Sequence, residues 1–356
     1  MRTKNHRSGQ QPQVRQRRRS IALLGCDGFN VNNRLVEELQ RLAPHEVYGY
    51  DLVDTPKRQD CFQFVHVEDD EDLAQRLRKQ RPTDVLIETP DDVHAKHIAM
   101  ALDLGARVFC EKPVATTGLE LANLRKLFTT ADLERRLFII DHYKNLDLVQ
   151  VLKANGRRWL GEIKRIKIVL LESQGIGPDQ IRSHAQGMAN FLHHVLAFAS
   201  MFLDLRSFEP TTSMTANHPD SPVPDTYRAA VFQRNGSTPA VIQGAVGKYI
   251  EHPRKAIFVE GTRGWANLDR ERNELRVECN DGWSISLSAK PDSGYRGLAR
   301  ALTMDESQMS LVSFPVAVEA LRLLEAAQQR ADWLTSYPSG RTQLFSGTKS
   351  PTKRAA

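Results

Sequence analysis

Short apolar segments alternate with segments of helical spacing between Ser20 and residue 140, and this alternation restricts the fold more than any other feature of the sequence. The first apolar segment is Ser20–Gly25, and Leu35, Leu39 and Leu42 then share one helix face. The pattern continues with strands expected at 46–51, 64–67, 84–88, 107–110 and 137–140, and with helices at 69–80, 94–104 and 118–128. It predicts an α/β Rossmann N-terminal domain with a doubly wound parallel sheet.

The pattern changes after Asp141. A helix at 146–153 stops at Gly156, a β-branched strand is expected at 163–172, and a long helix at 186–204. Strand-like segments separated by turn signals then fill 227–232, 240–246, 256–260, 265–268, 275–278 and 283–287, before a helix at 314–330. This order predicts an α+β C-terminal domain with a largely antiparallel open sheet. We expect domains at 20–145 and 146–332 between a disordered basic tail at 1–19 and a flexible basic tail at 333–356.

The net charge of +6 comes from the two tails, since residues 20–340 hold 38 basic and 43 acidic residues. A nucleic-acid groove in the folded body is therefore not expected. The sequence contains no apolar run of the ~20 residues that span a bilayer. Its four cysteines form no CxxC pair, so neither a zinc ribbon nor a disulfide framework is expected. We expect a cytoplasmic protein that does not bind membranes.

Several polar groups follow expected strands, where an open α/β sheet binds its ligand. Glu111-Lys112-Pro113 closes one strand, and the turn Gly25-Cys26-Asp27-Gly28-Phe29 follows the first one. The turn keeps only two glycines, so its sequence is equally typical of an ordinary strand–turn–helix connection that binds no phosphate. Asp51 lies 26 positions after Gly25, where an acid binds the ribose 2′-hydroxyl of NAD, although it could also be a simple turn residue.

We therefore expect a nicotinamide cofactor at this edge. NAD is preferred because the Asp51 carboxylate repels a 2′-phosphate, and NADP is the alternative because Lys57 and Arg58 follow. A histidine that starts a helix, such as His94, can also be a capping or surface residue. The expected cofactor contacts are Gly25, Asp27, Gly28, Phe29, Asp51, Thr89, Pro90, His94, Glu111 and Lys112.

The reacting centre is expected where Asp141-His142-Tyr143 ends the last strand of the first domain. Asn190 and His194 stand four positions apart and share a helix face, whereas His193 points elsewhere as a packing or surface residue. A histidine paired with a carboxylate can take the proton of a hydroxyl as hydride leaves the same carbon. We assign catalysis to Lys112, Asp141 and His194, and substrate contact to His142, Tyr143 and Asn190. No metal is expected.

The segment VLIETPDDVHAKHIAMALDLGARVFCEKPVATT resembles the central segment of the glucose–fructose oxidoreductase/inositol dehydrogenase family (Gfo/Idh/MocA). GRRWLGEIKRI at 156–166 and VEGTRGWANLD at 259–269 are similar to later parts of that family. The resemblance implies a Rossmann domain, an α+β domain whose sheet forms dimer contacts, and NAD(P)-dependent chemistry on a sugar or cyclitol hydroxyl. It implies Lys112 and His194 as the catalytic pair, with Asn190 where the family has aspartate.

The turn GCDG, the EKP segment and Asp141-His142-Tyr143 are also similar to motifs of the glucose-6-phosphate dehydrogenase family. This second resemblance implies that Asp141 and His194 form the base dyad and that His142 contacts the substrate. The chain departs from that family at Lys144-Asn145-Leu146, where the family has glycine-lysine-glutamate, so recognition of a phosphate is not implied.

The sequence thus predicts an NAD(P)-dependent dehydrogenase or ketoreductase of a sugar, sugar phosphate or cyclitol, working as a homodimer or homotetramer. The alternative is a ligand-sensing regulator on the same fold, which the incomplete glycine turn, Asn190 and the basic tails would fit. A tetrapyrrole reductase is a third interpretation, and the polar set of candidate groups argues against it.

Overall fold

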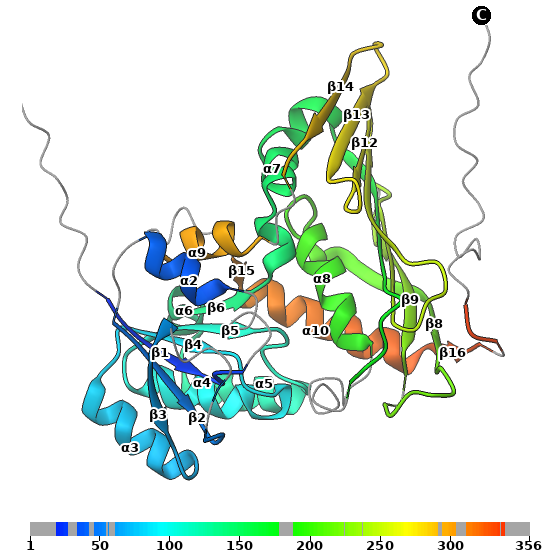
Figure 1. The fold of residues 1–356 in the computed structure, drawn as a ribbon. Helices are drawn as coiled ribbons and strands as arrows, with labels where there is room; N and C mark the ends of the chain where they lie inside the picture. The colour runs from blue at the N-terminus through cyan, green and yellow to red at the C-terminus, as the bar shows by residue number, and fades with distance from the viewer. Residues whose placement is uncertain are drawn as a thin grey trace, which may run out of the picture.

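Two sheets organise the chain in the computed structural model (Figure 1). The structure describes residues 19–27, 34–42, 46–54, 56, 61–177, 188–223, 225–236, 238–290, 294–303, 311–334 and 336–338. The predicted N-terminal tail lies outside these residues except for Arg19, and the predicted C-terminal tail lies outside them except for 333–334 and 336–338.

The N-terminal sheet has seven strands in the order β15-β6-β5-β4-β1-β2-β3. Its strands are β1 (Ser20–Leu24), β2 (Glu46–Asp51), β3 (Gln63–His66), β4 (Asp84–Ile87), β5 (Arg107–Glu111), β6 (Leu137–Ile140) and β15 (Val312–Ser313). All pairs are parallel except β15 with β6. The predicted doubly wound sheet is confirmed. Because β1 lies between β2 and β4, the strand order reverses there, which is where such sheets bind ligands.

The helices between the strands of this domain are α2 (Leu35–Leu42), α3 (Asp70–Gln80), α4 (His94–Asp103), α5 (Gly118–Leu127) and α6 (Thr130–Arg136). Three of these five described helices, α3, α5 and α6, begin at a residue whose side chain caps them. The Asp69 carboxylate accepts the backbone N–H groups of Glu71 and Asp72 at the start of α3. Thr117 and Glu120 form a reciprocal capping box on α5. Helix α6, which is only seven residues long, was not predicted.

The second sheet has nine strands in the order β14-β13-β12-β11-β7-β10-β9-β8-β16. They are β7 (Ile163–Leu171), β8 (Phe208–Ala216), β9 (Tyr227–Arg234), β10 (Val241–Gly247), β11 (Arg254–Gly261), β12 (Gly264–Asp269), β13 (Glu274–Cys279), β14 (Ser284–Ser288) and β16 (Ala331–Trp333). Only the β7–β10 and β8–β16 pairs are parallel. The expectation of a largely antiparallel sheet is confirmed, although β8 and β16 were not predicted.

Helices α7 (Asp147–Leu160), α8 (Ala189–Ala199) and α10 (Phe314–Gln329) pack on one face of the second sheet (Figure 1). The prediction that the first of these stops at Gly156 is wrong. A Cβ atom at Gly156 would lie 3.0 Å from the Phe202 ring, so this glycine permits close packing inside the helix. The helix ends at Gly161 instead, which has a φ of +74°.

The chain returns to the N-terminal domain after the second sheet. Helix α9 (Tyr295–Thr303), which was not predicted, packs against α2, and β15 extends the first sheet. Phe314, at the start of α10, is buried in the core of the N-terminal domain. The expected boundary at residue 145 therefore omits a later segment that completes the first domain.

The ordered chain also continues past residue 332, where the flexible tail was expected to start. The Leu334 N–H donates to the Thr215 carbonyl at 2.9 Å, and the Tyr337 hydroxyl donates to the Thr226 carbonyl at 3.1 Å.

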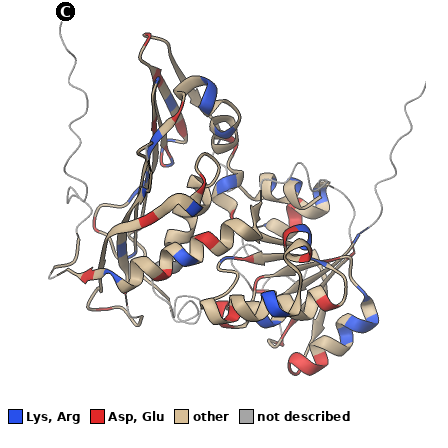
Figure 2. Cartoon of the chain, turned by 180° about the vertical axis from the view of Figure 1, so that it is seen from behind, with Lys and Arg blue, Asp and Glu red and all other residues tan. Residues whose placement is uncertain are grey.

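Across the described residues, Lys and Arg are interspersed with Asp and Glu on both domains (Figure 2).

Candidate active site

The glycine turn after β1 packs directly on the end of β4. Gly25 has a φ of +87°, and a Cβ atom there would lie 2.7 Å from the Glu88 carbonyl carbon and from the Thr89 nitrogen. Only glycine fits this position without moving β4. The turn therefore lies tightly against the switch point of the sheet, where the N–H groups of Gly25 and Cys26 donate to the Tyr50 carbonyl and the Asp51 carboxylate. Asp27 follows in the same turn, whereas Gly28 and Phe29 lie outside the described residues.

Asp51 connects the end of β2 to this turn. Its carboxylate accepts the Cys26 N–H at 2.6 Å and the Val53 N–H at 3.3 Å. Asp51 therefore orders a turn, as one of the two interpretations expects, and it is half-exposed, while its contact with a ribose stays a prediction. Lys57 and Arg58 lie outside the described residues.

Thr89 and Pro90 follow β4 at the same edge and are half-buried. His94 was predicted to contact the cofactor, but its side chain is completely buried. Its Nδ1 lies 2.7 Å from the Pro113 carbonyl oxygen, and its Nε2 lies 2.7 Å from the Thr89 carbonyl oxygen. We therefore reassign His94 from cofactor contact to a structural role, in which it links the loops after β4 and β5.

The Glu111-Lys112-Pro113 segment begins at the last residue of β5 and has a cis Lys112–Pro113 bond. The Glu111 carboxylate accepts the N–H of Lys112 at 2.6 Å, which fixes the local backbone. The Lys112 ammonium lies 4.8 Å from the centroid of the Phe191 ring, on the first turn of α8. The lysine thus reaches from the first domain to the helix that carries His194.

Asp141 and His194, separated by 53 positions, form a buried pair. The His194 Nδ1 lies 3.1 Å from the Asp141 Oδ2, and the side-chain exposures are 4% and 0%. Burial raises the pKa of Asp141, but the charge of His194 and its hydrogen bond outweigh this effect and hold the pKa at about 2. Asp141 is therefore ionised at neutral pH and fixes the orientation of the imidazole. The predicted pairing is confirmed, and its catalytic role stays a prediction.

Aromatic side chains surround this pair. The His194 ring centroid lies 4.8 Å from that of Tyr143 and 5.6 Å from that of His142. His142 also stacks on Tyr295 of α9 at 5.6 Å. Burial and the nearby charge of His194 lower the pKa of His142 to about 3, so His142 is neutral at physiological pH. The predicted substrate residues His142 and Tyr143 therefore lie beside the dyad.

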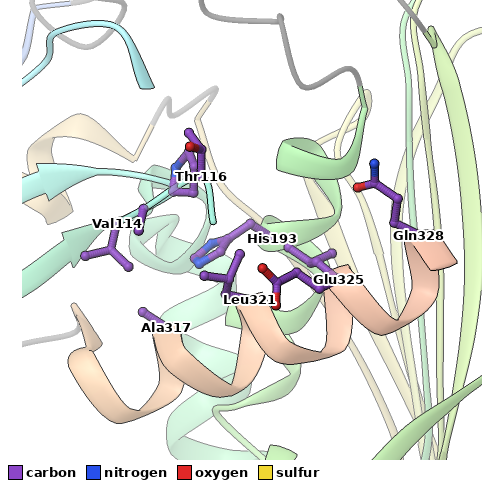
Figure 3. A pocket seen from close by; sticks show the side chains of 10 residues that line it. Val114, Thr116, His193, Ala317, Leu321, Glu325 and Gln328 are labelled. Atoms are coloured by element: carbon purple, nitrogen blue, oxygen red, sulfur yellow. The ribbon is translucent and has the colours of Figure 1, made fainter. Parts of the chain in front are cut away.

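Asn190, the third predicted substrate residue, lies in the first turn of α8, and its side chain is outside the described part of the structure. His193 points away from the dyad, as predicted for a packing residue. Its ring lines a cavity of about 30 Å³ between the loop after Pro113 and helix α10, where Figure 3 shows it near Leu321 and Glu325. Among the described residues, neither ring nitrogen of His193 has a hydrogen-bond partner.

Sequence reasoning missed part of the site. The Phe191 ring has a second cation beside it, since the Lys248 ammonium is 5.3 Å from its centroid. Lys248 and Lys255 both form ion pairs with Glu172, which follows β7, and they hold the pKa of Glu172 at about 2 against the opposing effect of burial. These residues come from three neighbouring strand ends of the second sheet, and no local motif indicates that they meet.

No group of three or more His, Cys, Asp or Glu side chains in the described residues could hold a metal ion. None of the described helices combines the length and apolar character that a membrane crossing needs.

Residues 20–142 match the family model GFO_IDH_MocA, an oxidoreductase family with an NAD-binding Rossmann fold. A comparison with curated protein sequences finds no match.

Solved structures share the whole fold. A 3-ketoreductase from Actinomadura kijaniata in complex with TDP-benzene and NADP gives a TM-score of 0.68 at 17% identity, covering 89% of this chain and 99% of its own. A levoglucosan dehydrogenase in complex with NADH and levoglucosan gives 0.68 at 16% identity, with coverages of 88% and 98%. A biliverdin reductase from Synechocystis, bound to biliverdin and NADP+, gives 0.68 at 14% identity, with coverages of 88% and 98%. At these identities the likeness establishes the fold and leaves the substrate open.

Proposed function

We propose that this chain, whose residues 20–142 belong to the Gfo/Idh/MocA oxidoreductase family, is an NAD(P)-dependent dehydrogenase or ketoreductase of a sugar, sugar phosphate or cyclitol. The observation that carries the proposal is the buried Asp141–His194 pair. It adjoins the Phe191 ring, on which the Lys112 ammonium also lies. A proton acceptor held by a carboxylate, with a cation nearby, is a set of groups that can assist the oxidation of an alcohol.

The described residues fit a nicotinamide cofactor. Glycine at position 25 lets the turn lie close to the end of β4 at the switch point of the sheet, where a pyrophosphate would bind, and Asp51 would accept a hydrogen bond from a ribose 2′-hydroxyl. When bound, the oxidised nicotinamide would supply the hydride acceptor. The Asp51 carboxylate favours NAD because it repels the 2′-phosphate of NADP.

The protein's own residues would handle the proton and the oxygen. His194 would take the hydroxyl proton of the substrate as the C–H bond breaks, while Asp141 stabilises the resulting imidazolium. Lys112 would donate a hydrogen bond to the same oxygen as it becomes a carbonyl. In the reverse direction, His194 would return the proton to the alkoxide oxygen. A binding regulator would not require this set of groups.

His142, Tyr143 and Asn190 would contact the substrate. The face of the second sheet opposite α7, α8 and α10 would be the surface through which copies of the chain associate as a homodimer or homotetramer.

The test is nicotinamide absorbance after the protein is mixed with NAD or NADP and pooled sugars, sugar phosphates and inositols. The variant His194→Asn is run in parallel with His193→Asn, its neighbour outside the dyad. We expect turnover in one pool that His194→Asn abolishes and His193→Asn keeps. Reduced cofactor is also mixed with ketoses and with biliverdin, to cover the reverse direction. If the protein binds NADH directly but shows no turnover in any of these mixtures, the result would support the ligand-sensing regulator instead.

A further inference from the structure

A second histidine of helix α4 holds the side chain of Thr89 at the cofactor edge. The Thr89 Oγ1 lies 3.0 Å from the Nδ1 of His97, and the Nε2 of His97 lies 3.0 Å from the Oδ1 of Asp70. His97 stands one turn after His94, whose Nε2 contacts the Thr89 carbonyl oxygen. Two histidines therefore fix the backbone and the side chain of the same residue.

The order of these groups sets the direction of each hydrogen bond. Hydrogen bonds from Lys96 and His97 outweigh burial and lower the pKa of Asp70, so its carboxylate is ionised and can only accept. The Nε2 of His97 must then carry a hydrogen. The neutral ring leaves Nδ1 bare, so the Thr89 hydroxyl donates to it.

Burial keeps His97 in this neutral form. The residue is 5% exposed, and burial lowers the pKa of His97 even though Asp70 favours its protonation. The other charged or titratable groups that act on it are His94 and Lys96, and both lower its pKa further. The hydroxyl proton of Thr89 is thus committed to His97 at neutral pH.

Thr89 follows β4 at the switch-point edge of the first sheet, where sheets of this kind bind dinucleotides. Its nitrogen packs against Gly25 of the glycine turn, and the neighbouring strand β5 leads to Lys112. Since its only proton is used internally, the Thr89 oxygen can only accept from a ligand. A ribose carries hydroxyl groups that can donate.

We infer that His97 and Asp70 are positioning residues that turn the Thr89 hydroxyl proton away from the crevice, so that its oxygen accepts a hydrogen bond from the ribose of the nicotinamide half of the cofactor. This inference rests on the proposed function, because it requires a bound dinucleotide.

A double-mutant cycle on NADH binding, followed by fluorescence, tests the inference. Thr89→Val removes the hydroxyl at constant shape and should weaken NADH binding about 5-fold, the usual effect of one hydrogen bond. Asp70→Asn should have a similar effect. Lys96 also donates to Asp70, so the new amide side chain would turn its carbonyl oxygen toward Lys96 and its nitrogen toward His97. That amide nitrogen donates to Nε2, moves the ring hydrogen to Nδ1 and reverses the Thr89 hydroxyl.

Because both changes act on one contact, the double variant should bind NADH no more weakly than Thr89→Val alone. Thr89→Ser should bind normally. Lys96→Ala, which removes the other partner of Asp70, should also bind normally. AMP, which lacks the nicotinamide half, should bind all variants equally.

Normal NADH affinity in Asp70→Asn, additive losses in the double variant, or an equal loss of AMP affinity would each overturn the inference. A drop in unfolding temperature without a change in affinity would show that the network is only structural. Absence of NADH binding by the wild-type protein would instead refute the proposed function itself.

Discussion

Replacing Asp141 with asparagine removes the charge of the buried dyad and keeps its shape. The pKa of Asp141 is lowered from 3.8 to about 2, which corresponds to about 2 kcal/mol of stabilisation of the charged form. Because the folded pKa is depressed, this contribution is present above about pH 4 and is lost as the pH falls toward 2. Asp141→Asn should therefore unfold about 2 kcal/mol more easily at pH 7, and this difference should shrink below pH 4.

Turnover should fall more steeply than stability. The asparagine cannot stabilise the imidazolium of His194, so kcat should drop by a factor of about 10²–10⁴ while NADH binding is kept. Urea unfolding followed by circular dichroism, at pH 7 and in steps toward acid, measures the first effect. Asp204→Asn, at an exposed ion pair in the second domain, is the matched control and should change stability little. If Asp141→Asn matches the wild type in both stability and turnover at pH 7, the reasoning about the dyad is refuted.

Four further changes probe the remaining parts of the site. Lys112→Met should lower kcat at least about 100-fold with little change in NADH affinity, as stopped-flow and binding titrations would show, because the substrate oxygen loses its cation; an unchanged kcat would remove Lys112 from catalysis. Gly25→Ala should destabilise the fold by more than about 1–2 kcal/mol, since its φ is +87° and the new Cβ meets Glu88, and calorimetry together with NADH titration would detect this. Asp51→Asn should raise the ratio of NADP to NAD kcat/KM about tenfold by removing charge repulsion, and an unchanged ratio would place the ribose elsewhere. Burial lowers the pKa of His193 to about 3, so the protein should lose stability as the pH falls below about 6.5 and the unfolded state takes up a proton at this residue. His193→Leu should make the fall of Tm with decreasing pH less steep, and an unchanged dependence of Tm on pH would contradict the lowered pKa.

The N-terminal domain was predictable because its information is local. Each of its parallel strands is a short apolar run, and α3 and α5 carry their own caps. The dependence on local sequence also explains why the end of α7 was predicted wrongly and why β15 was not predicted. Helix α7 runs through Gly156, since the close packing of Phe202 outweighs the low helix propensity of glycine. Strand β15 has only two residues and pairs with a strand more than 170 positions earlier, so no window of sequence indicates it.

The residues of the candidate site also fall into those that local sequence could predict and those that it could not. Lys112, Asp51 and Gly25 follow predicted strands, and the topology of a parallel sheet brings such residues to one edge. His94 showed the limit of this reasoning, because its position at a strand–helix junction did not reveal that backbone carbonyls occupy both its nitrogens.

Strand periodicity and motif spacing are properties of neighbouring positions, so they were enough to predict the fold class and the cofactor edge and to single out Asp141 and His194. The distance of 3.1 Å between the Asp141 carboxylate and the His194 ring depends on the tertiary structure. The tertiary structure also decided that Phe191 meets Lys112 and Lys248, and that Asp70 reaches Thr89 through His97. These contacts join segments that are distant in the chain, and the packing of α8 and α4 against the sheets sets their distances.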